Sequence, residues 1–175
     1  MGLNGTLLQD NRHLGERAGA PVAERREPAN DAMLRAEAAC RASGARLTPI
    51  RRRVLETLQA TRGSLGAYDL AEALADEEGR RLAPITIYRA LEFLIAQGLA
   101  HRVASRNAFI ACAHGHRPEE LVAILICEAC GEVEERTAPG LTTALSQLLG
   151  HARFDPHLKS LEIAGRCTRC STRSE

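Results

Sequence analysis

The sequence predicts an α+β protein in two parts: a front half of short helices closed by a β-hairpin, and a smaller α/β back half. Three observations support this prediction. Apolar residues recur at helical spacing up to about residue 98, strand-like runs follow, and two Cys-x-x-Cys pairs lie in the second part. A chain of 175 residues can hold one or two small domains. Residues 1–29 lack periodicity and are expected to form a mobile tail, which leaves domains at 30–105 and 106–175.

Boundary signals divide the front half into four helices. The second helix has Thr48 as its N-cap and Pro49 at its first helical position. Gly79 and Gly98 follow the third and the fourth. The first predicted helix covers about 30–43, and the second begins at 49 and ends before a turn at 63–66. The third covers 67–78 and the fourth 84–97. Their inward faces hold Ile50, Val54, Leu55 and Leu58, then Leu70 and Leu74, then Ile87, Leu91, Leu94 and Ile95.

A β-hairpin follows the fourth helix, with strands at 99–104 and 107–113. Three helices followed by a hairpin is the order of a winged helix-turn-helix domain, whose second helix enters the major groove of DNA. On the fourth helix Thr86 and Arg89 point away from the apolar face, and Tyr88 borders it. Arginine reads guanine O6 and N7 in that groove, and a surface ion pair is the alternative role for Arg89.

Charge is unevenly distributed along the chain, although the formal net charge is only +1. Residues 41–62 carry six arginines against one acid, Glu56, whereas residues 107–175 carry seven basic and nine acidic side chains. We expect the front half to approach DNA phosphates; a solvated helix face explains the charge alone equally well. The candidates for phosphate contacts are Arg51, Arg52 and Arg53.

The back half is predicted as strand, strand, helix and strand. Residues 121–127 form a continuous apolar run typical of a central strand, residues 131–138 alternate beside it, and 157–165 form the last strand. The apolar face of the helix holds Leu141, Ala144, Leu145 and Leu148. A unit this small and this apolar is expected to pair with a second copy, so we predict a homodimer with a small α/β dimerisation domain.

The two Cys-x-x-Cys pairs are the most specific motif. Each pair can direct two sulfurs at one centre, and two pairs complete a tetrahedral S4 shell that suits Zn(II). Gly131 supplies backbone freedom directly after the first pair. A redox dithiol uses one pair at a helix N-terminus after a strand, and disulfides are disfavoured because the N-terminus does not resemble a signal peptide. The predicted ligands are Cys127, Cys130, Cys167 and Cys170.

Further zinc-ligand residue types gather at the junction of the two halves. A metal held by histidine, cysteine and carboxylate there would clamp the hairpin against the back half. A thiolate at Cys112 favours zinc over Fe(II) or Mn(II), which prefer shells rich in nitrogen and oxygen. Taken singly, each residue also fits an ordinary role, such as a surface histidine or a small buried cysteine. The set is His101, Cys112, His114, His116, Glu119, Glu120, Glu134 and Glu135.

The order of five motifs resembles the ferric uptake regulator family, and within it the zinc uptake regulators. The motifs are LTPIRRRVLETL, AYDLAEAL, ITIYRALEFLIAQGLAHRV, CxxCGEVEE and a last CxxC. The resemblance covers residues 30–170. AYDL and the GLAHRV stretch point to the zinc branch, and the H-H-x-D-H-type segment of iron sensors is missing before the first Cys-x-x-Cys.

This resemblance implies two zinc ions per chain, one structural at the four cysteines and one regulatory. The matching regulatory ligands are His101, Cys112 and Glu135. They match the first, second and fourth positions of the family's ligand set. The third position falls on Glu120 where the family has a histidine, so either Glu120 binds the metal or His116 or His114 replaces it. Tyr88 and Arg89 match the family's base-contacting pair.

Together these observations predict a cytoplasmic, homodimeric, zinc-responsive transcriptional repressor of zinc-uptake genes. Its partner is a pseudo-palindromic double-stranded DNA operator. A sibling regulator that senses iron, manganese or peroxide is the alternative. A zinc hydrolase or deaminase is disfavoured because four cysteines close the first site and the deaminase H-x-E…P-C-x-x-C pattern is absent. We expect no enzyme activity, no membrane partner and no small-molecule ligand besides the metal; a zinc-binding interaction module without DNA affinity is the third class.

Overall fold

The computed structural model describes residues 29–75, 79–113, 121–137, 139–154 and 160–172. The predicted tail at 1–29 lies outside these residues except for its last position. The candidate ligands His114, His116, Glu119 and Glu120 also lie outside them, so their roles stay predictions. Within the described ranges, no helix combines the length and the apolar character needed to cross a membrane.

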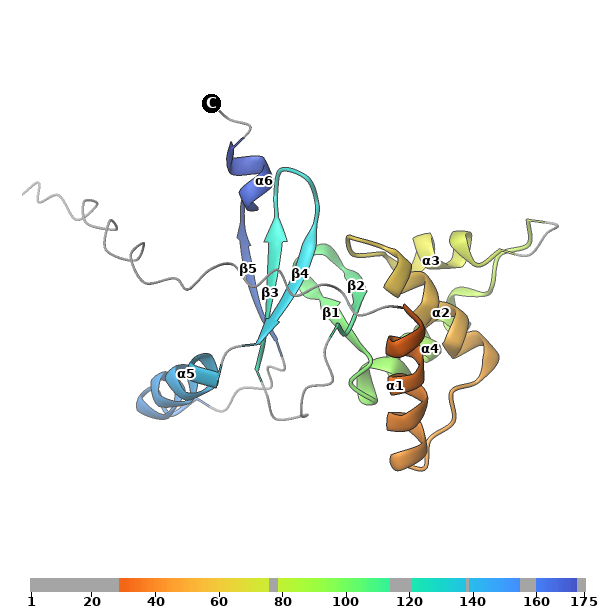
Figure 1. Ribbon diagram of the computed structural model, residues 1–175, viewed down its shortest axis with the longest axis horizontal. Coiled ribbons are helices and arrows are strands. Elements are labelled where there is room, and N and C mark those ends of the chain that lie inside the picture. Colours follow the sequence, from red (N-terminus) through yellow and green to blue (C-terminus); the bar gives the residue numbers. More distant parts are fainter. Residues whose placement is uncertain (1–28, 76–78, 114–120, 138, 155–159, 173–175) are drawn as a thin grey trace, which may run out of the picture.

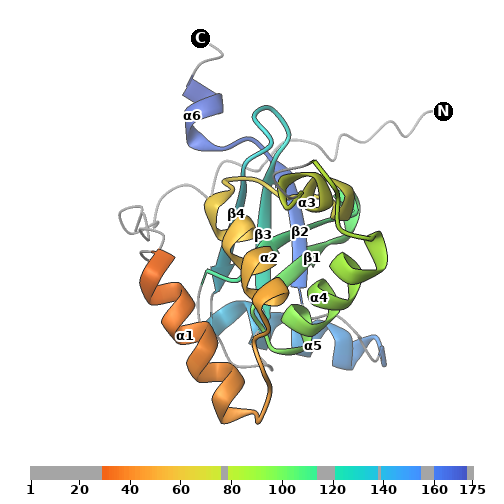
Figure 2. The ribbon, with the colours of Figure 1, turned by 90° about the vertical axis from the view of Figure 1, so that its right-hand side faces the viewer.

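Four helices form the front half, as the sequence predicts (Figures 1 and 2). They are α1 (Ala29–Ala42), α2 (Pro49–Ala60), α3 (Ala67–Ala73) and α4 (Pro84–Ala96). Thr48 stands at the N-cap of α2, although its side chain makes no capping hydrogen bond. The prediction for α3 was wrong at its end, which lies at Ala73 and not at 78. There Leu74 leaves the helical region with ψ 9°, and its carbonyl accepts a hydrogen bond from Arg53 Nη2 at 3.2 Å.

The front core is built from one face of each helix, together with the residues where the hairpin begins. The predicted inward residues that are buried are Val54, Leu55, Leu58, Leu70, Leu74, Ile87, Leu91 and Leu94. Ile50 and Ile95, at the start of α2 and near the end of α4, are only half-buried. Leu99, Ala100 and Phe109 of the hairpin region complete this core.

The hairpin lies between the two halves and belongs to both cores. It consists of β1 (Ala100–Val103), the short 3-10 helix η1 (Ala104–Arg106) and β2 (Ala108–Ala111), with the two strands antiparallel. Figure 2 shows α2 and α4 on the near side of the hairpin and the strands of the back half behind it. Phe109 packs into the front core, whereas Val103 and Ile110 pack into the back core. The predicted division at 105 and 106 therefore falls inside η1, in the turn of the hairpin.

A three-stranded sheet forms the back half, in the order β4-β3-β5. Its strands are β3 (Val122–Cys127), β4 (Val133–Thr137) and β5 (Ser160–Gly165); α5 (Pro139–His151) connects β4 to β5, and α6 (Thr168–Ser171) follows (Figure 1). β3 is the central strand, as its apolar run predicts, antiparallel to β4 and parallel to β5. No sequence signal predicts α6, which is only four residues long. This arrangement carries both Cys-x-x-Cys pairs to the same end of the sheet.

Candidate metal centres and DNA-facing surface

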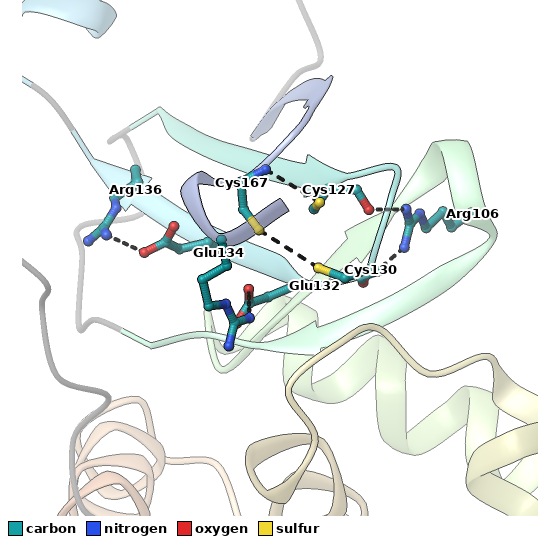
Figure 3. Close-up of polar contacts among 9 residues, drawn as sticks. Arg106, Cys127, Cys130, Glu132, Glu134, Arg136 and Cys167 are labelled. Atoms are coloured by element: carbon teal, nitrogen blue, oxygen red, sulfur yellow. Dashed lines mark hydrogen bonds and ion pairs between the residues drawn. The ribbon is translucent and has the colours of Figure 1, made fainter. Parts of the chain in front are cut away.

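Four cysteines meet at one end of the sheet, as their spacing predicts. Cys127 ends β3, Cys130 follows in the turn toward β4, Cys167 is the N-cap of α6 and Cys170 lies within it. Their sulfurs all lie within 4.8 Å of one another, and those of Cys130 and Cys167 are 3.8 Å apart (Figure 3). A tetrahedral shell with Zn–S bonds of ~2.3 Å has S–S edges of about 3.8 Å. The cluster therefore fits Zn(II).

Backbone hydrogen bonds assemble this cluster from both strands. In the turn after β3, the Gly131 N–H donates to Cys127 O at 3.0 Å, and Gly131 has a φ of +76°, in the left-handed region that favours glycine. The Glu128 N–H donates to Gly165 O at 2.8 Å, which holds the end of β5 beside the first pair. The Cys167 N–H then donates to Cys127 Sγ at 3.4 Å. Sheet pairing thus places the second pair opposite the first.

Hydrogen bonds within the cluster move two of the thiol pKa values in opposite directions. The backbone N–H of Cys167, followed by that of Cys130, lowers the pKa of Cys127 to about 6. Hydrogen bonds with the side chains of Cys167 and Cys130 raise the pKa of Cys170 to about 12. Neighbouring thiolates disfavour one another's charge, so a divalent cation is what allows four of them to be ionised together.

A second cluster lies where the hairpin meets the sheet. His101 belongs to β1, Cys112 follows β2 directly and Glu135 belongs to β4. Glu135 Oε1 is 3.7 Å from Cys112 Sγ, and Glu135 Oε2 is 3.6 Å from His101 Nε2. All three residues are buried, and one ligand atom from each lies within 4.8 Å of the others. The structure thus brings together the three regulatory ligands that the family resemblance implies; we call them the hinge cluster.

The alternation of β4 separates Glu135 from its neighbour Glu134. Glu134 is exposed and pairs with Arg136 (Figure 3), whereas the Glu135 side chain is 2% exposed and accepts a hydrogen bond from the Ala113 N–H at 2.8 Å. A buried carboxylate costs free energy unless its charge is compensated. The Glu135 carboxylate faces both His101 and the Cys112 thiol, which lies at hydrogen-bonding distance from it. A divalent cation among the three ligand atoms would compensate the charge and bind all three side chains. The donor set of the hinge cluster therefore fits a metal ion.

The residues predicted to read bases lie on α4. Arg89 is exposed there, while Thr86 and Tyr88 are half-buried and Tyr88 packs against the front core. Arg89 is thus accessible on the helix that the sequence predicts to enter the major groove. Contacts with DNA stay a prediction.

The three arginines of α2 differ in their surroundings. The Arg51 guanidinium lies 3.5 Å from the centroid of the Phe93 ring, and Arg52 forms an ion pair with Glu37. Arg51 and Arg52 are half-buried by these contacts, whereas Arg53 is exposed although it also donates to the Leu74 carbonyl. Arg53 thus presents the most accessible charge of the three.

Arg106 and Glu162 lie beside these sites and carry no motif that sequence reasoning could have used. Both join the hairpin turn to the sheet through contacts between residues 21 to 58 positions apart in the chain. Only the folded structure brings such partners together.

Over residues 42–164 the sequence matches the Ferric uptake regulator family. The chain belongs to the ferric uptake regulator family. Members of this family are transcription regulators and not enzymes, in agreement with the expectation from the sequence. The α+β architecture with a front helical half and a hairpin is therefore the family's fold.

Similar proteins include regulators from both sides of the choice that the sequence left open. A zinc uptake regulation protein of Escherichia coli K12 is 35% identical over 138 residues, covering 79% of this chain and 80% of that protein. A peroxide operon regulator of Bacillus subtilis 168 is 31% identical over 137 residues, covering 74% and 86%. A solved zinc uptake regulator in complex with zinc and DNA is 33% identical, with a TM-score of 0.75, covering 85% of this chain and 98% of that one.

Proposed function

We propose that this protein is a zinc-responsive repressor of zinc-uptake genes that binds operator DNA as a homodimer in the cytoplasm. The observation that carries the proposal is the hinge cluster, because its three buried ligand side chains come from both strands of the hairpin region and from the back sheet. Its thiol favours zinc over harder metal ions. The similarity to a zinc uptake regulator solved with zinc and DNA supports the same assignment.

The proposal includes two zinc ions per chain. The four-cysteine site holds one as a closed structural shell, and the hinge cluster holds the other. His101, Cys112 and Glu135 supply three ligands of the regulatory site, and the fourth comes from Glu120, or from His116 or His114 in its place. An ion there joins the front half at 30–105 to the dimerisation half at 106–175.

Zinc occupancy controls DNA binding through the angle between the halves. In the joined arrangement the α4 helices of the two protomers match successive half-sites of the operator. By linkage, operator DNA raises zinc affinity by the same factor that zinc raises DNA affinity, typically ~1–3 kcal/mol of coupling.

The experiment that tests this function is the removal of the labile zinc from the purified dimer. A chelator that takes one zinc per chain and leaves the four-cysteine site filled is expected to weaken operator binding by about 5- to 150-fold. Adding zinc back is expected to restore it, as measured by fluorescence anisotropy on a labelled duplex. Operator affinity that does not change when this zinc is removed contradicts the proposed sensing.

Base reading by α4 gives a second prediction. Arg89→Ala is expected to lower operator affinity by ~1–3 kcal/mol and to relax preference at one base pair, because a bidentate contact to guanine is lost. Arg53→Ala is the matched control. It is expected to weaken binding to the operator and to a scrambled duplex alike, and to reduce the slope of log affinity against log salt concentration by about one. Competition binding at several salt concentrations separates the two effects. An Arg89→Ala protein that keeps its sequence preference excludes Arg89 from base reading.

The alternative function is a sibling regulator of iron, manganese or peroxide response, as the peroxide operon regulator's similarity suggests. Metal analysis of the dimer separates the two functions. Two zinc ions per chain support the zinc regulator, whereas one zinc with one iron or manganese supports the sibling. The ligand chemistry of Cys112 favours the first outcome.

A further inference from the structure

The turn of the hairpin is held against the back sheet by a carboxylate. Glu162 lies on β5, in register with the buried Ile124 of β3, so it faces the side of the sheet that packs against the hairpin. Glu162 Oε1 accepts a hydrogen bond from the Ala104 N–H at 2.5 Å, and Oε2 accepts one from the Ser105 N–H at 3.1 Å. One carboxylate thus satisfies two consecutive backbone donors of η1.

The ionised form of Glu162 is favoured in this position. Partial burial acts to raise the pKa of the Glu162 carboxyl, but hydrogen bonds from the Ser105 side chain and from the Ala104 and Ser105 amides outweigh it and hold the pKa below its ordinary value. Hydrogen bonds to a charged acceptor are stronger than those between neutral groups. The contact is therefore charge-assisted.

An arginine of the same turn reaches the cysteine cluster. Arg106 Nη1 donates to Gly131 O at 3.0 Å and Nη2 donates to Cys127 O at 3.2 Å, so one guanidinium spans two carbonyls of the first Cys-x-x-Cys turn (Figure 3). Gly63, after α2, lies beside the same turn, since a side chain at that position would come within 3.4 Å of Gly131 O. The metal-binding turn therefore lies close to the front half.

These contacts form a connection separate from the hinge cluster. His101, Cys112 and Glu135 join the start of β1 and the end of β2 to β4, whereas Arg106 and Glu162 hold the opposite end of the hairpin, at η1, to the cysteine turn and to β5. Two attachments at opposite ends of a hairpin fix its orientation, while one leaves it able to pivot.

We propose that Glu162 and Arg106 are positioning residues, a clasp that holds the hairpin turn on the dimerisation half in the arrangement that binds operator DNA. The inference rests on the proposed function and extends it. The hinge metal secures one end of the hairpin, and the clasp secures the other. The four-cysteine site stabilises the fold of the dimerisation half. Through its contacts with Arg106, it also supports the orientation of the DNA-binding half.

A substitution of Glu162 distinguishes the positioning role from a simple charge effect, because the two predict opposite changes in DNA affinity. Removing a carboxylate makes the protein more positive, which by charge alone strengthens binding to DNA phosphates. The clasp predicts the reverse: Glu162→Ala in the zinc-loaded full chain is expected to bind the duplex selected by the wild type at least about tenfold more weakly. Two backbone hydrogen bonds to the carboxylate are lost, and one charge-assisted hydrogen bond alone corresponds to about that factor. Glu162→Gln, which keeps the side-chain volume, is expected to show a smaller loss of the same sign.

The matched control is Glu134→Ala, which removes an exposed carboxylate from β4, the opposite edge of the same sheet. It is expected to leave operator affinity equal to that of the wild type or slightly stronger. Arg106→Lys provides the second arm, because it keeps the charge but cannot span two carbonyls; it is expected to weaken binding several-fold. Zinc content and dimer mass are measured for every variant.

Amide hydrogen exchange gives a readout that does not depend on DNA. Exchange at Ala104 and Ser105 is expected to accelerate in Glu162→Ala with two zinc ions retained. Unchanged exchange at these amides, or operator binding as tight as that of the wild type, overturns the clasp. If the wild type itself lacks zinc-dependent DNA binding, it is the proposed function that fails, and the exchange result then decides separately whether Glu162 holds the hairpin.

Discussion

Replacing Cys167 by serine is expected to remove one zinc per chain and to release α6 and the end of β5 from β3. A structural zinc contributes ~10–16 kcal/mol of apparent binding free energy in small zinc domains, comparable with the whole ~5–15 kcal/mol stability of a folded protein. We expect a loss of at least ~3 kcal/mol, which lowers Tm by roughly 10 °C for a chain of this size. Metal analysis and thermal unfolding of the purified variant measure both effects.

Cys40→Ala is the matched control for this loss. Cys40 is also buried, but it lies in the front core and outside both clusters. Its removal is expected to cost about 1 kcal/mol through a small cavity and to leave two zinc ions per chain. A Cys167→Ser protein that still holds two zinc ions per chain, or one with an unchanged Tm, contradicts a structural role for the four-cysteine site.

Local sequence signals predicted the helices and strands of this fold. The features that they did not predict involve contacts between residues far apart in the chain. Pro49 fixed the start of α2, and the apolar run ending at Cys127 marked the central strand, because both signals act within a few residues. The end of α3 at Ala73 was missed, and just beyond it the Leu74 carbonyl accepts a hydrogen bond from Arg53, a side chain of another helix. No local pattern records that contact.

The two metal clusters differ in how far the sequence alone could define them. The cysteine pairs carry their own geometry, because two residues three positions apart on a tight turn converge on one centre. The hinge cluster has no such spacing: His101, Cys112 and Glu135 come from three separate segments, and the family resemblance was needed to select them. Once β4 is placed, its alternation decides between Glu134 and Glu135 without that help.

Glu135→Gln is expected to abolish zinc-dependent operator binding while the four-cysteine zinc stays in place. The amide keeps the volume of the side chain and can still accept the Ala113 N–H, but it replaces an anionic carboxylate ligand with a neutral amide oxygen, which binds Zn(II) more weakly. Metal content is expected to fall from two zinc ions per chain to one. Operator affinity in the presence of zinc is expected to fall toward that of the chelated wild type, about 5- to 150-fold.

Glu134→Gln makes this result specific, because it changes the same residue type one position earlier on the same strand. Its side chain is exposed and contacts Arg136, so zinc content and operator affinity are expected to match those of the wild type. Isothermal titration with zinc and anisotropy on the operator duplex compare the two variants under one set of conditions. If Glu135→Gln retains the second zinc and responds to it, Glu135 is not a ligand, and the buried triad is an ion pair with a neighbouring thiol. Of the two carboxylates, only that of Glu135 lies within 4 Å of both His101 and Cys112. Loss of the zinc response in both variants would therefore assign the effect to the negative charge of β4 in general and not to a ligand at Glu135.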